Sequence, residues 1–221
     1  VGCAARLALS AWRARAGAPP GPVAVWVADR DGDALVGLDR DLFVRERVAI
    51  PRPVAVVARA DGGSWVASAR EPHPRAPVRV LRMDDRGRVL RSHSAAALLD
   101  LAAGPRGDAW GLEMGPDGGT ALVRFTPAVA RRTGRPRSAA RRLASADGAL
   151  LLGGEDGVLE RVTPERCSRR GLGAPILDVA RAAPGTRGAG GWWVLLGDGR
   201  VLRLDGELRT VGATRVPGAL W

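Results

Sequence analysis

Three aspartates alternate in the segment DRDGD, at Asp29, Asp31 and Asp33, and spaced carboxylates of this kind can bind calcium. An EF-hand loop needs acidic residues at positions 1, 3 and 5, glycine at position 6 and glutamate at position 12. Counted from Asp29, position 6 is Ala34 and position 12 is Arg40, so both decisive positions are wrong. The Asp-Gly pair inside the segment is better explained as a hairpin turn, because Asp-Gly adopts positive φ readily.

Two histidines are the next candidates for metal binding or acid–base chemistry. His73 lies in EPHPR and is expected in a proline-bracketed loop, whereas His93 lies in RSHS and is expected on an outer strand or at its end. Neither has a glutamate or histidine partner at the spacing of metal ligands, so both are interpreted as surface residues. The chain also has no CxxC pair and no Cys/His cluster, which argues against zinc. We predict no metal-binding residue.

Nucleophilic residues receive little support. The chain has no G-x-S-x-G segment, and a phosphate-binding P-loop is impossible because lysine is absent. Cys167, in ERCSRR, has arginine neighbours that can activate a thiol, but an inert side chain on an outer strand is the better interpretation. Cys3 and Cys167 can pair, although two cysteines so far apart make no disulfide framework. We predict no catalytic residue and no cofactor.

The formal net charge of +11 would ordinarily indicate a nucleic-acid or other acidic partner. Here all 34 basic residues are arginine, and lysine, asparagine, glutamine and tyrosine are absent, which is the composition that a very GC-rich, bacterial genome produces. The densest basic stretch, Arg131–Arg142, can grip phosphates but has no interleaved aromatic residue for base stacking. It is interpreted as a solvated connector, and no nucleic-acid partner is expected.

The elements that must position these residues repeat along the chain. The first marker is a tryptophan, or in one unit a leucine, within a short apolar segment: Trp26, Trp65, Trp110, Leu151 and Trp193. The second is an apolar segment that ends in aspartate or threonine: Asp39, Asp84, Thr126, Thr163 and Asp205. Successive spacings are 39, 45, 41 and 42 residues for the first marker and 45, 42, 37 and 42 for the second. Two independent markers with one shared period indicate a repeat architecture.

Each repeat divides into four short strands separated by glycine turns. In the second unit these are VAVVAR, SWVASA, VRVLRMD and RVLRSH, and in the fifth they are ILDVAR, WWVLL, RVLRL and LRTVG. Four strands in every 40–50 or so residues are typical of β-propeller blades. The predicted fold is therefore all-β, a β-propeller of about five four-stranded blades, or a truncated one of six. The repeated tryptophans are interpreted as core residues between blades.

The two ends of the chain allow several interpretations. Residues 1–22 are expected to form a closing strand, a short helix or the remnant of an export signal, and residues 23–221 the propeller. Val1–Cys3 resembles the end of a bacterial lipoprotein cleavage box, which would place the protein in the cell envelope or outside the cytoplasm, although an ordinary N-terminal segment explains three residues better. Thr214–Trp221 resembles the opening of a further blade. No apolar run approaches the roughly 20 residues of a membrane helix.

The segment VWVADRDGDALVGLD, residues 25–39, resembles the units of NHL-repeat propellers and of the related streptogramin-lyase-like and gluconolactonase-like propellers of bacteria. The shared pattern is an apolar strand, an Asp/Gly turn, a WVAD-type strand and an apolar strand ending in aspartate, and it extends over roughly residues 23–212. The lactonases and lyases of this group use His, Glu, Asn or Asp residues in the central channel, usually around a divalent metal. This chain contains no asparagine, so the resemblance implies the architecture and not the activity.

The predicted function is that of a non-catalytic propeller, a binding or interaction scaffold for a protein or a small ligand, because a rigid framework with variable loops carries no assembled catalytic set. The alternative is a degenerate or unrecognised propeller hydrolase or lyase, which would need three or more inward carboxylates within reach of a metal. The sequence assigns no binding residue. We expect a monomer without a membrane span.

Overall fold

The computed structural model describes residues 23–59, 61–73, 75–115, 117–136, 139–146, 148–182 and 191–216. The interpretations of residues 1–22, and most of that of Thr214–Trp221, lie outside these ranges. Within them the chain forms nineteen strands and one short 3₁₀ turn, Pro105–Gly107. The described part contains no helix with the length and apolar character needed to cross a bilayer. The all-β prediction is confirmed.

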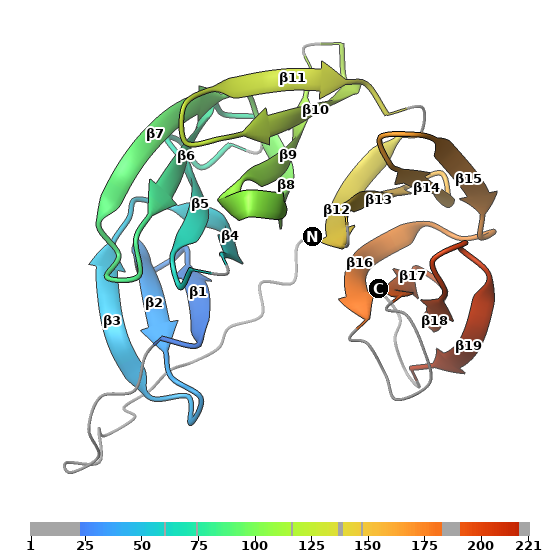
Figure 1. Ribbon diagram of the computed structural model, residues 1–221, viewed down its shortest axis with the longest axis horizontal. Coiled ribbons are helices and arrows are strands. Elements are labelled where there is room, and N and C mark those ends of the chain that lie inside the picture. Colours follow the sequence, from blue (N-terminus) through green and yellow to red (C-terminus); the bar gives the residue numbers. More distant parts are fainter. Residues whose placement is uncertain are drawn as a thin grey trace.

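The strands form five antiparallel sheets in chain order, and each sheet is one blade (Figure 1). The first blade has three described strands: β1 (Val25–Asp29), β2 (Ala34–Leu38) and β3 (Val44–Ala49). The second has β4 (Pro53–Ala58), β5 (Ser64–Ala69), β6 (Val78–Met83) and β7 (Val89–Ala95). The third has β8 (Leu98–Ala103), β9 (Ala109–Met114), β10 (Thr120–Phe125) and β11 (Ala130–Gly134). The fourth has β12 (Ala140–Ala146), β13 (Ala149–Gly154), β14 (Val158–Val162) and β15 (Cys167–Gly171). The fifth has β16 (Ile176–Ala182), β17 (Gly191–Leu196), β18 (Arg200–Leu204) and β19 (Thr210–Arg215).

The blades follow one another around a centre, with β4, β8, β12 and β16 innermost and in contact in that order (Figure 1). Apolar side chains from facing blades form four buried clusters, one between each consecutive pair. The first and fifth blades face a sector that no described strand fills. The four-strand division predicted for the second and fifth units is confirmed, except that β19 includes Thr214, which the sequence pattern assigned to a further blade.

In the second to fifth blades the repeated tryptophan, or the leucine that replaces it, lies on a middle strand directly opposite an arginine of the next strand, in the pairs Trp65–Arg82, Trp110–Arg124, Leu151–Arg161 and Trp193–Arg203. In the first blade Trp26 lies on β1, opposite Gly37. The core interpretation is right for Trp65, which is 0% exposed, and for Trp26, which is buried. It is wrong for Trp193, which is 41% exposed because it projects from the face of the fifth blade that no described blade covers.

The second marker caps the turn that follows it. The Oδ1 atom of Asp84 accepts hydrogen bonds from the backbone N–H groups of Arg86 and Arg88, at 3.0 and 2.8 Å. Desolvation alone would raise the pKa of the Asp84 carboxyl, but the hydrogen bonds from the N–H and guanidinium of Arg88 outweigh it and hold the pKa below its ordinary value. The same capping role is played by Asp39, Thr126, Thr163 and Asp205. Only a short side chain with an acceptor oxygen can do this, which explains the recurrence of aspartate and threonine.

Candidate binding cleft between the third and fourth blades

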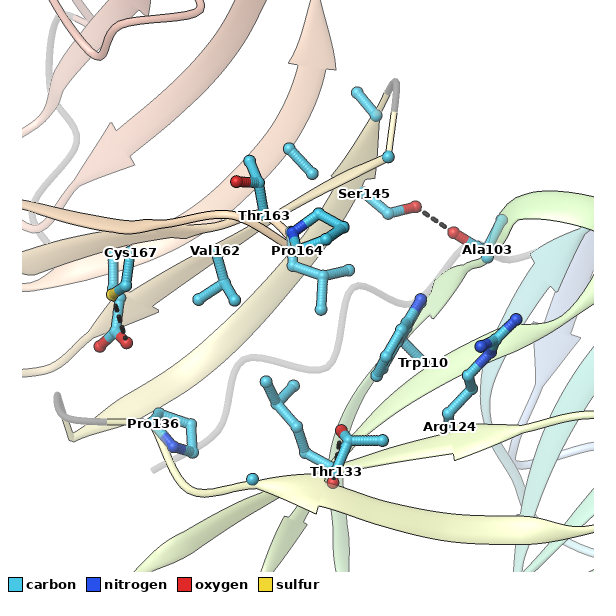
Figure 2. Close-up of a pocket in the computed structure, with 18 of the residues that line it drawn as sticks. Ala103, Trp110, Arg124, Thr133, Pro136, Ser145, Val162, Thr163, Pro164 and Cys167 are labelled. Atoms are coloured by element: carbon cyan, nitrogen blue, oxygen red, sulfur yellow. Dashed lines mark hydrogen bonds between the residues drawn. The ribbon is translucent and has the colours of Figure 1, made fainter.

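A cleft of ≈ 780 Å³ separates the third blade from the fourth. Trp110 and Leu122 of the third blade line one wall, and Leu150 and Val162 of the fourth line the other. Figure 2 shows Trp110 between Arg124 on one side and the opposite wall on the other. The volume lies within the range of roughly 300–1,000 Å³ that ligand sites occupy. The lining, with many apolar groups and a few polar ones, is also typical of such sites.

The cleft lies where the outer strand of the third blade provides no side chain that bridges to the fourth. Thr133 and Gly134 form a β-bulge opposite Leu122, and the Thr133 hydroxyl donates to the Leu122 carbonyl of its own blade at 3.3 Å. In the first four blades the outermost strand places a residue opposite the strand before it, on the side of the next blade: Val48, His93, Gly134 and Arg170. Val48 packs against the core shared with the second blade, and Arg170 donates to Thr210 Oγ1 of the fifth blade at 2.9 Å. Gly134 has no side chain that could reach the fourth blade, and a Cβ atom built on it meets no atom within 4 Å.

The residue that meets this position from the next blade is also smaller at the cleft. This residue comes directly after the arginine that lies opposite the repeated tryptophan or leucine. It is Met83, Phe125, Val162 and Leu204 in the second to fifth blades. Phe125 is fully buried in the core between the second and third blades. At the same place between the third and fourth blades stands Val162, which is only partly buried. A histidine and a phenylalanine at one interface are thus replaced by a glycine and a valine at the next.

The filled interface shows what the cleft lacks. The His93 ring lies 5.9 Å from the ring of Trp65 and 6.1 Å from that of Phe125, and its Nε2 donates to the carbonyl oxygen of Thr126 at 3.0 Å. Burial lowers the pKa of His93, and Arg91 lowers it further, against the opposing effect of the hydrogen bond to Thr126. His93 lies on the outer strand β7, as predicted. Its interpretation as a surface residue is wrong, because it faces the next blade.

Charged groups stand beside Trp110. The Arg124 guanidinium lies 5.8 Å from the centre of the Trp110 ring, and its Nε donates to Asp108 Oδ2 at 2.9 Å. Asp108 is buried, so Arg124 has a fixed counter-ion. In register, Arg124 lies directly opposite Arg131 of β11, which is exposed and has no ion pair with any residue in the described ranges. Of these two neighbouring arginines, Arg124 lines the cleft and pairs with Asp108, whereas Arg131 lies beside it without a carboxylate partner among the described residues.

The fourth-blade wall carries a carboxylate and a thiol. Glu160 is buried, and its Oε1 accepts a hydrogen bond from Cys167 Sγ at 3.2 Å. Cys167 is exposed and lies on the outer strand β15, where the sequence placed it, whereas Cys3 lies outside the described ranges. At the inner end, the hydroxyl of Ser145 donates to the carbonyl of Ala103 and joins the two walls (Figure 2).

The inner strands carry their own set of ionisable residues. Each inner strand has a bulge, and the residue after it is Ala55, Asp100, Arg142 or Asp178. Asp100 accepts the N–H of Leu143 at 2.8 Å, and Arg142 Nε donates to the carbonyl of Leu177 at 2.5 Å, so these side chains join β8 to β12 and β12 to β16. Desolvation raises the pKa of Asp100, and nearby Asp178 adds to the rise, against the opposing backbone hydrogen bonds and Arg142. Among the described residues, no three His, Cys, Asp or Glu side chains gather as a metal site would require.

The remaining candidates fall into turns, loops and strands. Asp29 lies in the β1–β2 hairpin, where its Oδ1 accepts the N–H of Gly32 at 2.9 Å, so the hairpin interpretation is confirmed, while the absence of calcium binding stays a prediction. His73 is exposed in its loop, as expected, with Nδ1 accepting the N–H of Arg75 at 3.1 Å. The interpretation of Arg131–Arg142 as a connector is wrong at both ends, which belong to β11 and β12.

Sequence reasoning missed the cleft. The residue at issue is Gly134, which lies opposite Leu122 as His93 lies opposite Val80 in the preceding blade. Sequence spacing does not show this equivalence, because His93 follows Arg82 by 11 residues and Gly134 follows Arg124 by 10, with a bulge in the strand register at Leu122.

Fold and cleft together define a β-propeller. No family model and no curated protein matches the sequence. Among solved structures, BBS1N, determined in complex with ARL6DN, is 17% identical with a TM-score of 0.62, and the match covers 84% of this chain and 61% of that one. A protein of unknown function from Bacteroides caccae is 14% identical with a TM-score of 0.59, over 89% of this chain and 71% of that one. AztD from Citrobacter koseri is 16% identical with a TM-score of 0.52, over 83% of this chain and 54% of that one.

These likenesses show the fold alone, because their sequence identities are low. The chain spans 61% of the length of BBS1N, so what the whole of that protein does cannot be carried over directly.

Proposed function

We propose that this protein is an interaction scaffold whose cleft between the third and fourth blades binds a segment of a partner protein. The observation that carries the proposal is Gly134. Three of the four described blade interfaces are bridged at this position by a side chain, and the fourth is left hollow. The walls are strands of two packed sheets, so the cleft is preformed and binding need not order it first. BBS1N in complex with ARL6DN is an instance of a protein of this fold with a protein partner.

The finer assignments belong to the same proposal. We place the protein near the NHL-repeat and streptogramin-lyase-like propellers, with a high-GC bacterial origin, a propeller that extends from residue 23 to residue 221 and a non-catalytic role. The turn-capping aspartates support the first of these, because they are the residues on which the resemblance rests.

The experiment fills the cleft and asks whether binding is lost. A phage-displayed library of random peptides is selected against the full chain, and the affinity of each enriched peptide is measured for the parent and for Gly134→Phe. Gly134 does not have positive φ and its Cβ direction is open, so the new ring enters the cleft without backbone strain. We expect the affinity to fall by about tenfold or more, a difference of about 1.4 kcal/mol.

The matched control is Gly171→Phe. Gly171 also lies on an outer strand, is exposed and has no atom within 4 Å of its Cβ direction, but it does not line the cleft. Peptides that bind Gly171→Phe like the parent and fail to bind Gly134→Phe support the proposal. An unsuccessful selection, or peptides that bind Gly134→Phe as tightly as the parent, would overturn it.

A further inference from the structure

We propose that the bound segment presents an aromatic side chain next to a carboxylate, an inference that rests on the proposed function above. The chain itself supplies the template. Between the second and third blades, the His93 ring lies 5.9 Å from Trp65 and 6.1 Å from Phe125. In the cleft, Trp110 holds the place of Trp65, and Thr133 and Gly134, which form a bulge opposite Leu122, stand where His93 would be and provide no ring. A ring brought by the partner takes the empty place.

The surroundings of that place suit a flat apolar group. Arg124 covers one side of Trp110, and Figure 2 shows the other side turned towards the open cleft. Leu122 and Leu150 are both buried and line opposite walls, and Val162 lines the fourth-blade wall beside Leu150. A ring inserted here contacts apolar carbon on both walls and the indole between them, which favours an aromatic over a branched aliphatic side chain.

The carboxylate follows from the two arginines. Arg124 and Arg131 lie directly opposite each other, and like charges in that position repel. Asp108 compensates Arg124, whereas no described residue forms an ion pair with Arg131. An acidic residue adjacent to the inserted ring compensates the second charge. The net charge of +11 works in the same direction by drawing acidic segments towards the protein.

The second blade offers a control of the same geometry. Arg91 lies directly opposite Arg82, as Arg131 lies opposite Arg124, and Arg91 is likewise exposed. The neighbouring space is filled there by His93. Arg91→Glu therefore changes the net charge by the same amount as Arg131→Glu, at the same place in a blade, without altering the cleft.

The experiment uses short synthetic peptides labelled with fluorescein and measures anisotropy with the full chain. The peptides differ at two sites: a central Trp or Leu, and flanking Glu, Gln or Lys. We expect the Trp–Glu peptide to bind, and its Leu, Gln and Lys counterparts to bind about tenfold more weakly or worse. Arg131→Glu is expected to weaken the Trp–Glu peptide by a similar factor, and Arg91→Glu to leave its affinity within about twofold.

The outcomes separate this inference from the function on which it rests. Binding that is lost in Gly134→Phe but prefers Leu, Gln or Lys peptides overturns the proposed chemistry and leaves the scaffold function standing. If no peptide depends on Gly134, the scaffold function is overturned too. If indole-3-acetate alone binds as tightly as the Trp–Glu peptide, the cleft is a small-molecule site and the protein partner is overturned. Equal losses in Arg131→Glu and Arg91→Glu would show attraction by net charge alone and overturn the role of Arg131.

Discussion

The interfaces on the two sides of the third blade have the same backbone plan and opposite outcomes. Towards the second blade, Trp65, His93 and Phe125 fill the space, and Trp65 is 0% exposed with its Nε1 donating to the carbonyl of Gly107 at 2.9 Å. Towards the fourth blade, Trp110 stands at the edge of a cleft of ≈ 780 Å³. The tryptophan strands pair with the strands that follow them in corresponding registers. The outer ladders differ, because the bulge falls between Arg82 and Met83 in the second blade and between Leu122 and Val123 in the third. With this shift, Thr133 and Gly134 take the place of the histidine.

This contrast teaches that a repeat can specialise one interface without disturbing the fold. The blade is held by its own ladder of hydrogen bonds and by the capped turn, both of which are present in the third blade. The interface between blades is held by side chains, which can be removed one at a time. A propeller can therefore open a binding site between two blades at a cost confined to that interface.

The largest expected difference in stability between the two interfaces comes from truncating Trp65 and Trp110 in turn. Trp65→Ala should lower the free energy of unfolding by about 3–5 kcal/mol, because it leaves a cavity among buried neighbours and an unpaired Gly107 carbonyl. Trp110→Ala should cost clearly less, because its surroundings are already hollow. Chemical denaturation of the two variants and the parent measures both values.

Trp65→Phe serves as the control for cavity size and should fall between Trp65→Ala and the parent, since much of the apolar volume remains. If Trp65→Ala unfolds at the parent's denaturant concentration, or if the two alanine variants lose equal stability, the two interfaces are not different in the way described.

A third tryptophan extends the comparison to a face with no neighbour. Trp193 is 41% exposed and touches Arg203, whose guanidinium lies 5.9 Å from the ring centre. Trp193→Ala should cost only about 1 kcal/mol, the worth of an exposed cation–π contact with some apolar burial. Denaturation of the full chain measures it. A loss as large as that of Trp65→Ala would mean that part of the chain covers this face.

Filling the hollow interface should have a smaller effect of the opposite sign. Gly134→Ala is expected to raise the free energy of unfolding by roughly 0.5–1 kcal/mol, because glycine within a strand is destabilising relative to alanine and the new methyl group meets no neighbour. Thermal and urea unfolding report the change.

Gly87→Ala is the contrasting variant. Gly87 has φ of +74° and its Cβ would lie 2.3 Å from Val48 Cγ2, so the same substitution should destabilise the protein there. A loss of stability in Gly134→Ala would contradict the view that the cleft is open at this residue.

Sequence reasoning reached the fold and stopped short of the cleft, for a physical reason. The tryptophan and the capping residue of each unit interact within one blade or with fixed neighbours, so their spacing alone revealed the period: Trp65 and Asp84 are examples. The burial of Trp193 and His93 depends on which side chains of the adjacent blade lie opposite them, and the local sequence pattern does not contain this information. To interpret Gly134, both the repeat register and the facing residue of the next blade are needed, because a glycine leaves a cavity only when the facing residue is also small.

The smallest expected effect is a pH dependence that belongs to the filled interface alone. The pKa of His93 is lowered in the folded protein, chiefly by burial, so the unfolded chain binds a proton more tightly than the native state. Stability from this group is complete above about pH 6.5, the ordinary value of a histidine. It is lost as the pH falls from there through the folded-state pKa, so the free energy of unfolding should rise with pH across this window.

His93→Gln isolates the contribution, because glutamine can still donate to the Thr126 carbonyl but does not titrate. Urea denaturation of the parent and the variant from about pH 7.5 down to about pH 5 keeps the turn-capping aspartates ionised, because their pKa values are lowered, and Asp100, whose pKa is raised, is the same in both proteins. The parent should lose stability over this range and His93→Gln should lose less. The cleft has no histidine at this place and contributes no such pH dependence. If the stability of His93→Gln depends on pH as steeply as that of the parent, the titrating group lies elsewhere, and the ring is not held between Trp65 and Phe125 in its neutral form.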